Sequence, residues 1–314
     1  MRAAVIGASG QVGAALCARL RERGWEVLGT RGHFPSSPWP SLDIADLAAV
    51  ERFVASSAFE CVFFPAAVTF VDYCEDHPDE AMRVNRDAPA TAARAAAKQG
   101  ARFVSYSTEY VFDGTRGPYA EDDPPCPVSV YGRSKLECEQ ATLAENPLAL
   151  VVRTQVVYGP EPQEKNFVYQ MLRRLGSGLS PVRPGTTGFQ AGEAMRVPVD
   201  QVACPTYNAD LAAASVELVE RRLTGVFHVA GADALARYDF GRLACEVFGL
   251  DGTRLEPVST AELGQRARRP LSGALRTDRA RRELTSELRG PREGLEAMKR
   301  ALAQSPEHPS EGGS

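Results

Sequence analysis

Tyr131 and Lys135 are four residues apart in a stretch with helical periodicity, so we expect their side chains on one face of a helix. A phenol ordinarily has a pKa of about 10. Proton exchange near pH 7 requires that value to fall by about three units, or roughly 4 kcal/mol. A nearby ammonium group, together with a positively charged cofactor ring, can supply much of this stabilisation. The pair therefore predicts acid–base chemistry, although the same spacing also occurs by chance in surface helices.

Hydroxyl side chains precede this pair in the stretch Ser105–Thr108, which ends beside Glu109. The stretch follows a predicted strand, and open α/β sheets bind their ligands at the carboxyl ends of their strands. A hydroxyl at that place can orient a substrate carbonyl or carbinol. The sequence therefore predicts that these hydroxyls and the Tyr–Lys pair serve one reacting centre.

A glycine-rich turn lies near the start of the chain, between a predicted strand and a predicted helix. It consists of Gly7, Ala8, Ser9, Gly10, Gln11, Val12 and Gly13. The first glycine allows a tight turn, the second lets the backbone approach a pyrophosphate, and the third permits close packing of helix on strand. The helix N-terminus offers free N–H groups to the anion. This predicts a dinucleotide site, with an ordinary glycine-rich turn as the alternative.

The end of the second predicted strand bears on which dinucleotide binds. NAD-binding proteins usually place a carboxylate there, about 20 residues beyond the glycines, for the ribose 2′-hydroxyl. This strand ends instead in Gly29-Thr30-Arg31-Gly32. Arg31 can pair with a 2′-phosphate, which favours NADP(H) over NAD(H), unless it is a solvated loop charge.

The first half of the chain alternates short apolar runs with helical stretches. The predicted strands are Ala3–Ile6, Glu26–Gly29, Cys61–Phe64, Phe103–Tyr106 and Leu148–Arg153, and the predicted helices are Gln11–Arg23, Asp46–Ser57, Pro78–Lys98 and Ser129–Leu143. Because parallel strands need helical crossovers, the fold class is α/β, a doubly wound parallel (Rossmann) sheet.

We divide the chain into a dinucleotide-binding domain over residues 1–158 and a smaller C-terminal substrate lobe over 159–303. A strand at about 226–229 is expected to return to the main sheet, and helices are expected near 167–175, 209–222 and 237–248. Residues 304–314 are polar and end in Gly-Gly-Ser, which predicts a disordered tail.

Composition excludes several classes of function. The 314 residues carry a formal charge of −4, which offers no basic surface for nucleic acid. No apolar run approaches the roughly 18–20 residues of a membrane span, and the N-terminus lacks signal-peptide features, so the cytoplasm is the expected location. Seven scattered cysteines without C-x-x-C spacing, and four unpaired histidines, predict reduced thiols and no metal site.

The chain resembles the extended short-chain dehydrogenases/reductases, and within them the dTDP-4-dehydrorhamnose reductase family. The matching strings are Ser107–Gly114, Pro118-Tyr119 with Glu121 and Asp122, Tyr131–Glu137, Val71-Asp72 through Asn85, Arg153-Thr154 with Val157-Tyr158-Gly159, and Pro205-Thr206 with Asp210-Leu211. The resemblance covers roughly residues 1–300, and its middle strings are specific to the family.

The resemblance implies a role for particular residues. Thr108, Tyr131 and Lys135 occupy the family's catalytic places, with Tyr131 and Lys135 also touching the cofactor. The remaining cofactor positions that the resemblance supports, beyond the glycine turn, are Asp43 and Ile44 near the adenine and Ala66 and Ala67 beside the ribose and nicotinamide. Thr108, Glu109, Asn166 and Gln201 match the substrate side. Glu109 replaces the commoner Asp, Gln155 replaces Ser, and the stretch Pro160–Val199 is unusually long; these departures concern the sugar rather than the hydride chemistry.

The leading hypothesis is a reductase of a nucleotide-linked 4-keto-6-deoxysugar. Alternatives are a non-catalytic NADP-binding regulator similar to the methionine adenosyltransferase β-subunit, which the stretch Gly225–Gly231 also resembles, and a sugar-nucleotide epimerase. Dehydration is disfavoured because Tyr110, not a second acid, follows Glu109. Because members of this fold often form homodimers, a homodimer is a further expectation.

Overall fold

The computed structural model describes residues 1–176 and 194–304 and is built around a six-stranded parallel sheet. Its order is β10-β5-β4-β3-β1-β2. The strands are β1 (Arg2–Ile6), β2 (Glu26–Thr30), β3 (Cys61–Phe64), β4 (Arg102–Thr108), β5 (Leu150–Thr154) and β10 (Gly225–His228). The predicted doubly wound α/β fold is confirmed, and the late strand, β10, joins the main sheet beside β5.

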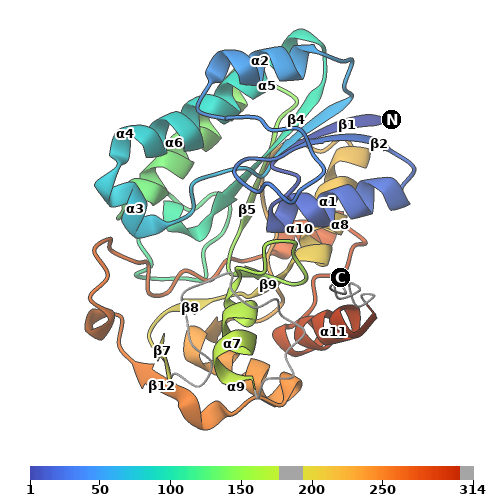
Figure 1. The fold of residues 1–314 in the computed structure, drawn as a ribbon. Helices are drawn as coiled ribbons and strands as arrows, with labels where there is room; N and C mark the ends of the chain where they lie inside the picture. Colours follow the sequence, from blue (N-terminus) through green and yellow to red (C-terminus); the bar gives the residue numbers. More distant parts are fainter. Residues whose placement is uncertain (177–193, 305–314) are drawn as a thin grey trace, which may run out of the picture.

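Helices cover both faces of this sheet because successive strand residues point to opposite sides. On one face, Ala3 and Val5 pack with Leu16 of α1 (Gln11–Glu22) and Leu211 of α8 (Asn208–Glu220). On the other face, Ala4 and its neighbours pack against α2 (Leu47–Ala55) and the alanine-rich α5 (Ala88–Lys98). Figure 1 shows α2, α5 and α6 (Val130–Glu145) on one side of the strands and α1 and α8 on the other.

The stretch expected as one helix over Pro78–Lys98 is interrupted. It consists of α4 (Pro78–Met82), a π-helical turn η1 (Arg83–Asp87) and α5, and the unpredicted short helix α3 (Val71–Asp76) precedes it. The π-turn places Asn85 in the interior, where its side chain bonds both backbone groups of Val68. The segment that follows β3 is therefore fixed against the π-turn.

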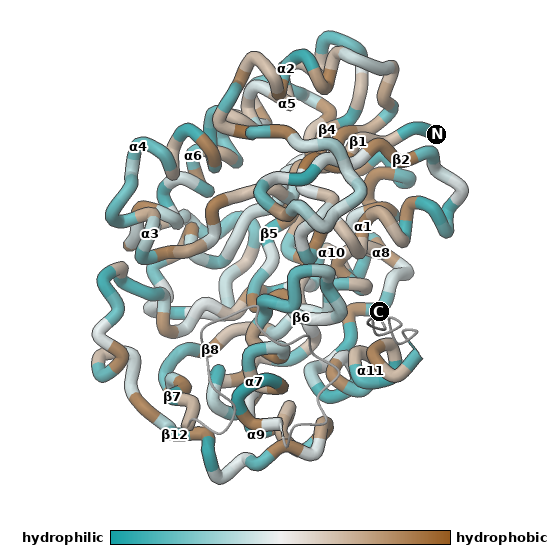
Figure 2. The backbone as a smooth tube through the Cα atoms, viewed as in Figure 1, coloured by the Kyte–Doolittle hydropathy of each residue, from teal (hydrophilic) through white to brown (hydrophobic). Residues whose placement is uncertain are grey.

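A second, smaller cluster forms below the carboxyl edge of the sheet (Figure 1). Its apolar core joins α7 (Phe167–Leu175), α9 (Arg237–Phe248) and α11 (Pro291–Gln304). Figure 2 shows hydrophobic and hydrophilic residues alternating along these helices. Short strands pair around it: β6 (Val157–Tyr158) with β9 (Thr206–Tyr207), β7 (Met195–Pro198) with β12 (Leu255–Val258), and β8 (Val202–Ala203) with β11 (Leu235–Ala236).

The remaining described elements connect these parts. They are the 3₁₀ turns η2 (Glu109–Val111), η3 (Gly252–Arg254) and η4 (Ala261–Leu263), and the helix α10 (Asp278–Glu283). Gln304 is the last residue of α11, and the rest of the predicted tail lies outside the described residues. The domain boundary at residue 158 remains a prediction.

Candidate active site

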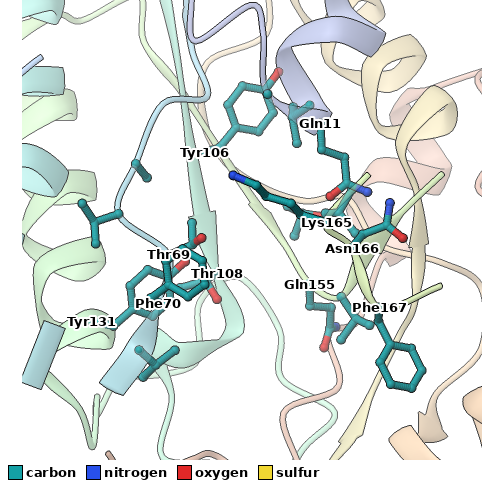
Figure 3. A pocket seen from close by; sticks show the side chains of 18 of the residues that line it. Gln11, Thr69, Phe70, Tyr106, Thr108, Tyr131, Gln155, Lys165, Asn166 and Phe167 are labelled. Carbon is teal, nitrogen blue, oxygen red and sulfur yellow. The ribbon is translucent and has the colours of Figure 1, made fainter. Parts of the chain in front are cut away.

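A cavity of about 1160 Å³ lies between the carboxyl edge of the sheet and the smaller cluster. With the exception of Arg31, every site residue that the sequence predicts lines this cavity: Gly7, Ser9, Gly10, Gln11, Val12, Gly13, Asp43, Ile44, Ala66, Ala67, Thr108, Glu109, Tyr131, Lys135, Asn166 and Gln201. Residues from seven segments of the chain, between Gly7 and Gln201, thus line one cavity. Figure 3 shows Thr108 and Tyr131 on one wall and Gln11, Gln155 and Asn166 on the opposite one.

The glycine turn at one end of the cavity has the geometry that a pyrophosphate requires. Gly7 has φ +99°, and a Cβ there would lie 2.9 Å from the Cβ of Ala66. A Cβ at Gly13 would lie 2.1 Å from the Gly7 carbonyl oxygen, so the helix can approach the strand only with glycine. The N-terminus of α1 has no side-chain cap, which leaves its first amides for an anion. These features fit a dinucleotide.

Arg31 lies beside the cavity rather than on its wall. Its Nη1 donates to the Gly32 carbonyl oxygen at 3.1 Å, whereas His33 lines the cavity. Asp43 does line it, and its Oδ1 accepts a hydrogen bond from the Ala45 amide at 2.9 Å. Contact of Arg31 with a 2′-phosphate therefore needs a different side-chain rotamer, and its role remains a prediction.

Thr108 ends β4, and Tyr131 and Lys135 lie in the first turns of α6; all three side chains are buried. Ser129 caps α6 by accepting from the Gly132 amide at 3.1 Å. A Cβ at Gly132 would lie 2.2 Å from the Tyr110 carbonyl oxygen, so glycine lets the helix lie directly on the turn after β4. This close packing brings the phenol to the threonine.

Hydrogen bonds also fix the Tyr131 backbone. The Ser134 hydroxyl donates to the Tyr131 carbonyl oxygen at 2.8 Å, and Asn85 Nδ2 donates to the Ser134 hydroxyl at 3.2 Å. Because Asn85 also holds Val68, the π-turn connects α6 to the cavity segment after β3. Asn85 belongs to a string that matches the family, but only the structure shows that it holds Val68 and Ser134 together.

The electrostatics of Tyr131 differ from the sequence-based expectation. The sequence predicts that Lys135 lowers the pKa of the phenol. In the structure, burial is the largest influence and raises the pKa of Tyr131, and the negative charge of Glu109 raises it further. The hydrogen bond with Thr108 lowers the pKa of Tyr131, but it offsets only part of this rise. The phenol is therefore protonated at neutral pH, which is the form that a proton donor requires.

Two polar cavity residues were not predicted as site residues. In the sequence, Gln155 is only a departure from the family, and Arg237 only follows the stretch that resembles the methionine adenosyltransferase β-subunit. Gln155 is 2% exposed, and neither of its amide atoms has a hydrogen-bond partner among the described residues. The next residue, Val156, has φ +43°, a strained conformation for a β-branched residue. Arg237 lies over the Phe167 ring, 5.1 Å from its centroid.

Asn166 and Gln201 also line the cavity, but both already have protein partners. Asn166 Oδ1 caps α7 by accepting from the amides of Val168 and Tyr169, and its Nδ2 donates to the Gly159 carbonyl oxygen at 2.9 Å. Gln201 Nε2 donates to Thr260 Oγ1 at 3.1 Å. Their geometry gives each a structural task, and contact with a substrate remains a prediction.

Several charged and aromatic residues outside the catalytic cluster have structural partners. Arg266 pairs with Asp76 at 2.7 Å and Arg269 with Asp72 at 3.0 Å, which joins their loop to α3. His77, one of the four histidines expected to be unpaired, in fact stacks on Tyr73 with 4.1 Å between the ring centroids. The His228 side chain is buried.

Two further findings concern residues 1–176 and 194–304. They contain no group of three or more His, Cys, Asp or Glu side chains arranged to hold a metal ion. None of their helices is both long and apolar enough to span a bilayer.

Comparison with known proteins supports the geometric interpretation. Residues 1–304 match the RmlD substrate binding domain family. The chain belongs to this family. It is 38% identical over 280 residues to the dTDP-4-dehydrorhamnose reductase of Mycobacterium tuberculosis, covering 87% of this chain and 84% of that protein. It is 36% identical over 279 residues to the probable low-salt glycan biosynthesis reductase Agl14 of Haloferax volcanii, covering 88% and 89%.

Structural comparison gives the same family. The dTDP-4-dehydrorhamnose reductase of Bacillus anthracis, solved in complex with NADP, superposes with a TM-score of 0.83 at 28% identity, covering 96% of this chain and 99% of that one. The chain is also 30% identical over 273 residues to the methionine adenosyltransferase 2 subunit beta of Xenopus tropicalis, covering 85% and 78%. The predicted membership of the extended short-chain dehydrogenase/reductase type, a class of oxidoreductases, is confirmed.

Proposed function

We propose that this chain is an NADPH-dependent reductase that converts the 4-keto group of a nucleotide-linked 6-deoxysugar to an alcohol. The observation that carries the proposal is the convergence of Thr108, Tyr131 and Lys135 on a cavity whose far end is the glycine turn. The similarity to dTDP-4-dehydrorhamnose reductases supports this class of substrate.

The cofactor proposal is NADP(H) in preference to NAD(H). A relative of the same family was solved with NADP, and β2 ends without a carboxylate in this chain. The amides of the first turn of α1 would hold the pyrophosphate, Ala66 and Ala67 would flank the ribose and nicotinamide, and Arg31 would reach the 2′-phosphate. When bound, NADPH supplies the hydride for the keto carbon.

The protein residues handle the proton and the developing charge. The buried Tyr131 phenol donates its proton to the keto oxygen as that oxygen becomes an alkoxide. The Thr108 hydroxyl hydrogen-bonds the same oxygen and orients it. The Lys135 ammonium, one helical turn from Tyr131, balances the phenolate that the transfer leaves and holds the cofactor ribose.

The direct test follows NADPH oxidation with dTDP-4-dehydrorhamnose and a panel of other nucleotide 4-ketosugars. Native protein is expected to oxidise NADPH with at least one of them. Tyr131→Phe, which removes only the hydroxyl, is expected to lower kcat by at least about a hundredfold. Unchanged turnover in the Phe variant would show that Tyr131 is not the acid.

The similarity to methionine adenosyltransferase 2 subunit beta supports a second candidate, a non-catalytic NADP-binding regulator. The same glycine turn would then hold NADP, while the partner would be an adenosyltransferase catalytic subunit. Co-purification with such an enzyme, together with absence of turnover on the ketosugar panel, would favour the regulator over the reductase.

The proposed small-molecule partner is the nucleotide sugar itself, and the proposed location is the cytoplasm. All seven cysteines are free thiols, which suits a reducing compartment. A homodimer is also proposed, and light scattering of the purified protein tests it.

A further inference from the structure

Glu109 is a buried carboxyl group directly beside the reacting centre. Its side chain follows Thr108 at the end of β4 and is only 7% exposed. A Cβ at Gly273 would lie 3.0 Å from Glu109 Cγ, so the backbone of the segment around Gly273 covers it from the smaller cluster. Burial raises the pKa of Glu109 to about 7. The positive charge of Arg237 lowers this pKa, but less than the hydrogen bonds from Thr108 and from the Glu109 backbone do.

The hydrogen of the Thr108 hydroxyl is already in use. Thr108 Oγ1 donates to Glu109 Oε2 at 2.8 Å and accepts from the Tyr110 amide at 3.3 Å. A threonine hydroxyl has one hydrogen to donate and two lone pairs to accept with. While Glu109 is ionised it can only accept, so Thr108 has no hydrogen left for a substrate oxygen.

We propose that Glu109 is a positioning residue that sets the direction of the Thr108 hydroxyl. As a neutral acid, Glu109 donates its own hydrogen to Thr108 Oγ1, and the Thr108 hydrogen is released toward the substrate oxygen. As a carboxylate, it retains the Thr108 hydrogen and its charge opposes proton release from Tyr131. This inference rests on the proposed reductase function, because that function makes Thr108 a donor to the keto oxygen.

The groups around Glu109 are close enough for its protonation state to change their pKa values. Glu109 interacts with polar or titratable groups of β4, η2, α6, α9 and the turn between β8 and β9: Thr108, Tyr110, Tyr131, Arg237 and Cys204. Arg269 of the 265–275 segment acts on Tyr110 and Arg237. The charge of Glu109 raises the pKa values of Tyr110, Tyr131 and Cys204. A neutral Glu109 therefore makes Tyr131 the better acid.

The kinetic test compares native protein with Glu109→Gln, whose amide N–H₂ donates to Thr108 at every pH. Native kcat for ketosugar reduction is expected to fall about tenfold per pH unit above pH about 7. In Glu109→Gln this fall is expected to disappear. The control is Glu137→Gln, a half-exposed residue of α6 paired with Arg86, which should keep the native profile. The same fall in Glu109→Gln would overturn the proposal.

A second measurement needs no substrate or cofactor. The infrared spectrum of native protein minus that of Glu109→Gln isolates the carbonyl band of a protonated Glu109 and excludes other buried acids such as Asp210. The band is expected at pH 5 and should be lost by pH 9, and Thr108→Val should move its midpoint upward because the Thr108 hydrogen bond favours the carboxylate.

The two measurements separate the two proposals. If no ketosugar is reduced but the band titrates and Thr108→Val shifts it, the reductase function fails while the coupling of Glu109 to Thr108 stands. A band that is absent at pH 5, or a midpoint that Thr108→Val leaves unchanged, would overturn the coupling whatever the substrate proves to be.

Discussion

The Gln155 side chain lies at the wall of the cavity with its amide nitrogen and oxygen both unpaired among the described residues. An unpaired buried polar group costs about 1–3 kcal/mol, and Val156 beside it adds the strain of a positive φ. A site can retain such unfavourable groups when a bound ligand satisfies them and so offsets their free-energy cost. A primary amide supplies two N–H donors and a carbonyl acceptor, which matches the carboxamide of a nicotinamide ring.

Gln155→Met keeps the shape of the side chain and removes both unpaired atoms. We expect the free protein to become more stable by about 1 kcal/mol in urea unfolding, because the desolvation cost disappears. NADPH affinity should fall about tenfold by calorimetry, whereas 2′,5′-ADP, which lacks nicotinamide, should bind as before.

Gln99→Met is the matched control for this substitution. Gln99 Nε2 donates to the Val54 carbonyl oxygen at 2.8 Å, so the same exchange there removes a satisfied bond and should destabilise the protein by about 1 kcal/mol. A destabilised Gln155→Met would show that its amide has partners in the free protein.

Glu109 also makes stability depend on pH in a direction that can be worked out. Its folded pKa of about 7 is higher than its ordinary 4.5, so the folded state binds more protons between these values. The contribution is complete below pH 4.5 and is lost as pH rises to about 7. Native protein should lose up to about 1.4 kcal/mol per pH unit in this window relative to Glu109→Gln.

Urea unfolding of both proteins at pH 5 and pH 8 measures this difference. Both retain His228, whose pKa burial lowers to about 3 and whose effect has the opposite sign, so it cancels in the comparison. A difference between the two proteins that stays constant with pH would contradict the raised pKa of Glu109.

At the scale of elements, one buried network joins α6 to three neighbouring strands. Glu139 of α6 accepts from Arg153 of β5 through two hydrogen bonds of 2.9 and 2.7 Å, and it also accepts from Ser107 of β4. Arg153 Nη1 lies 3.2 Å from Nε2 of His228 on β10. The helix that carries Tyr131 and Lys135 is thereby fixed relative to the strand that carries Thr108.

Glu139→Gln should destabilise the protein by about 3–5 kcal/mol, because it leaves the Arg153 charge buried without its carboxylate. Arg153→Met alone should destabilise the protein by a similar amount, because it leaves the Glu139 carboxylate buried without its cation. The double variant should cost clearly less than the sum of the two, and urea unfolding of all four proteins gives this coupling energy. Costs that simply add would show that the pair acts as two independent groups.

The sequence predicted the elements that have local patterns and missed those that depend on distant partners. The helix over Phe167–Leu175 has the expected bounds because its apolar periodicity is complete within the segment. The pairing of β7 with β12 joins stretches far apart in the chain, and no local signal precedes it. The π-turn around Asn85 was missed for the same reason, since its inward amide is explained only by Val68 and Ser134.

The site shows the same limit. The glycine turn and the Tyr–Lys pair were predictable because each depends on spacing within a few residues. Whether Arg31 reaches the cavity depends on its rotamer, and the acidity of Tyr131 depends on burial by other segments, so neither could be derived from spacing.

At the scale of the whole molecule, the main sheet is completed by residues that come after the smaller cluster begins. β10 is the neighbour of β5, and residues of α8 and Leu288 belong to the same core as Val5 and Phe63. Conversely, Gln163 Nε2 donates to the Ser9 carbonyl oxygen at 3.1 Å, so the later part of the chain also holds the glycine turn. The two parts are interleaved rather than joined in series.

A chain ending at residue 158 should therefore not fold as an independent NADPH-binding domain. It would expose the β5 edge and the sheet face that α8 covers, and uncovered strand edges and apolar faces promote aggregation. We expect such a fragment to lack a cooperative thermal transition by circular dichroism and to show no shift with NADPH. Residues 1–304 should melt cooperatively and at a higher temperature when NADPH is added. A fragment that melts cooperatively and binds NADPH would show that the sheet is complete without β10.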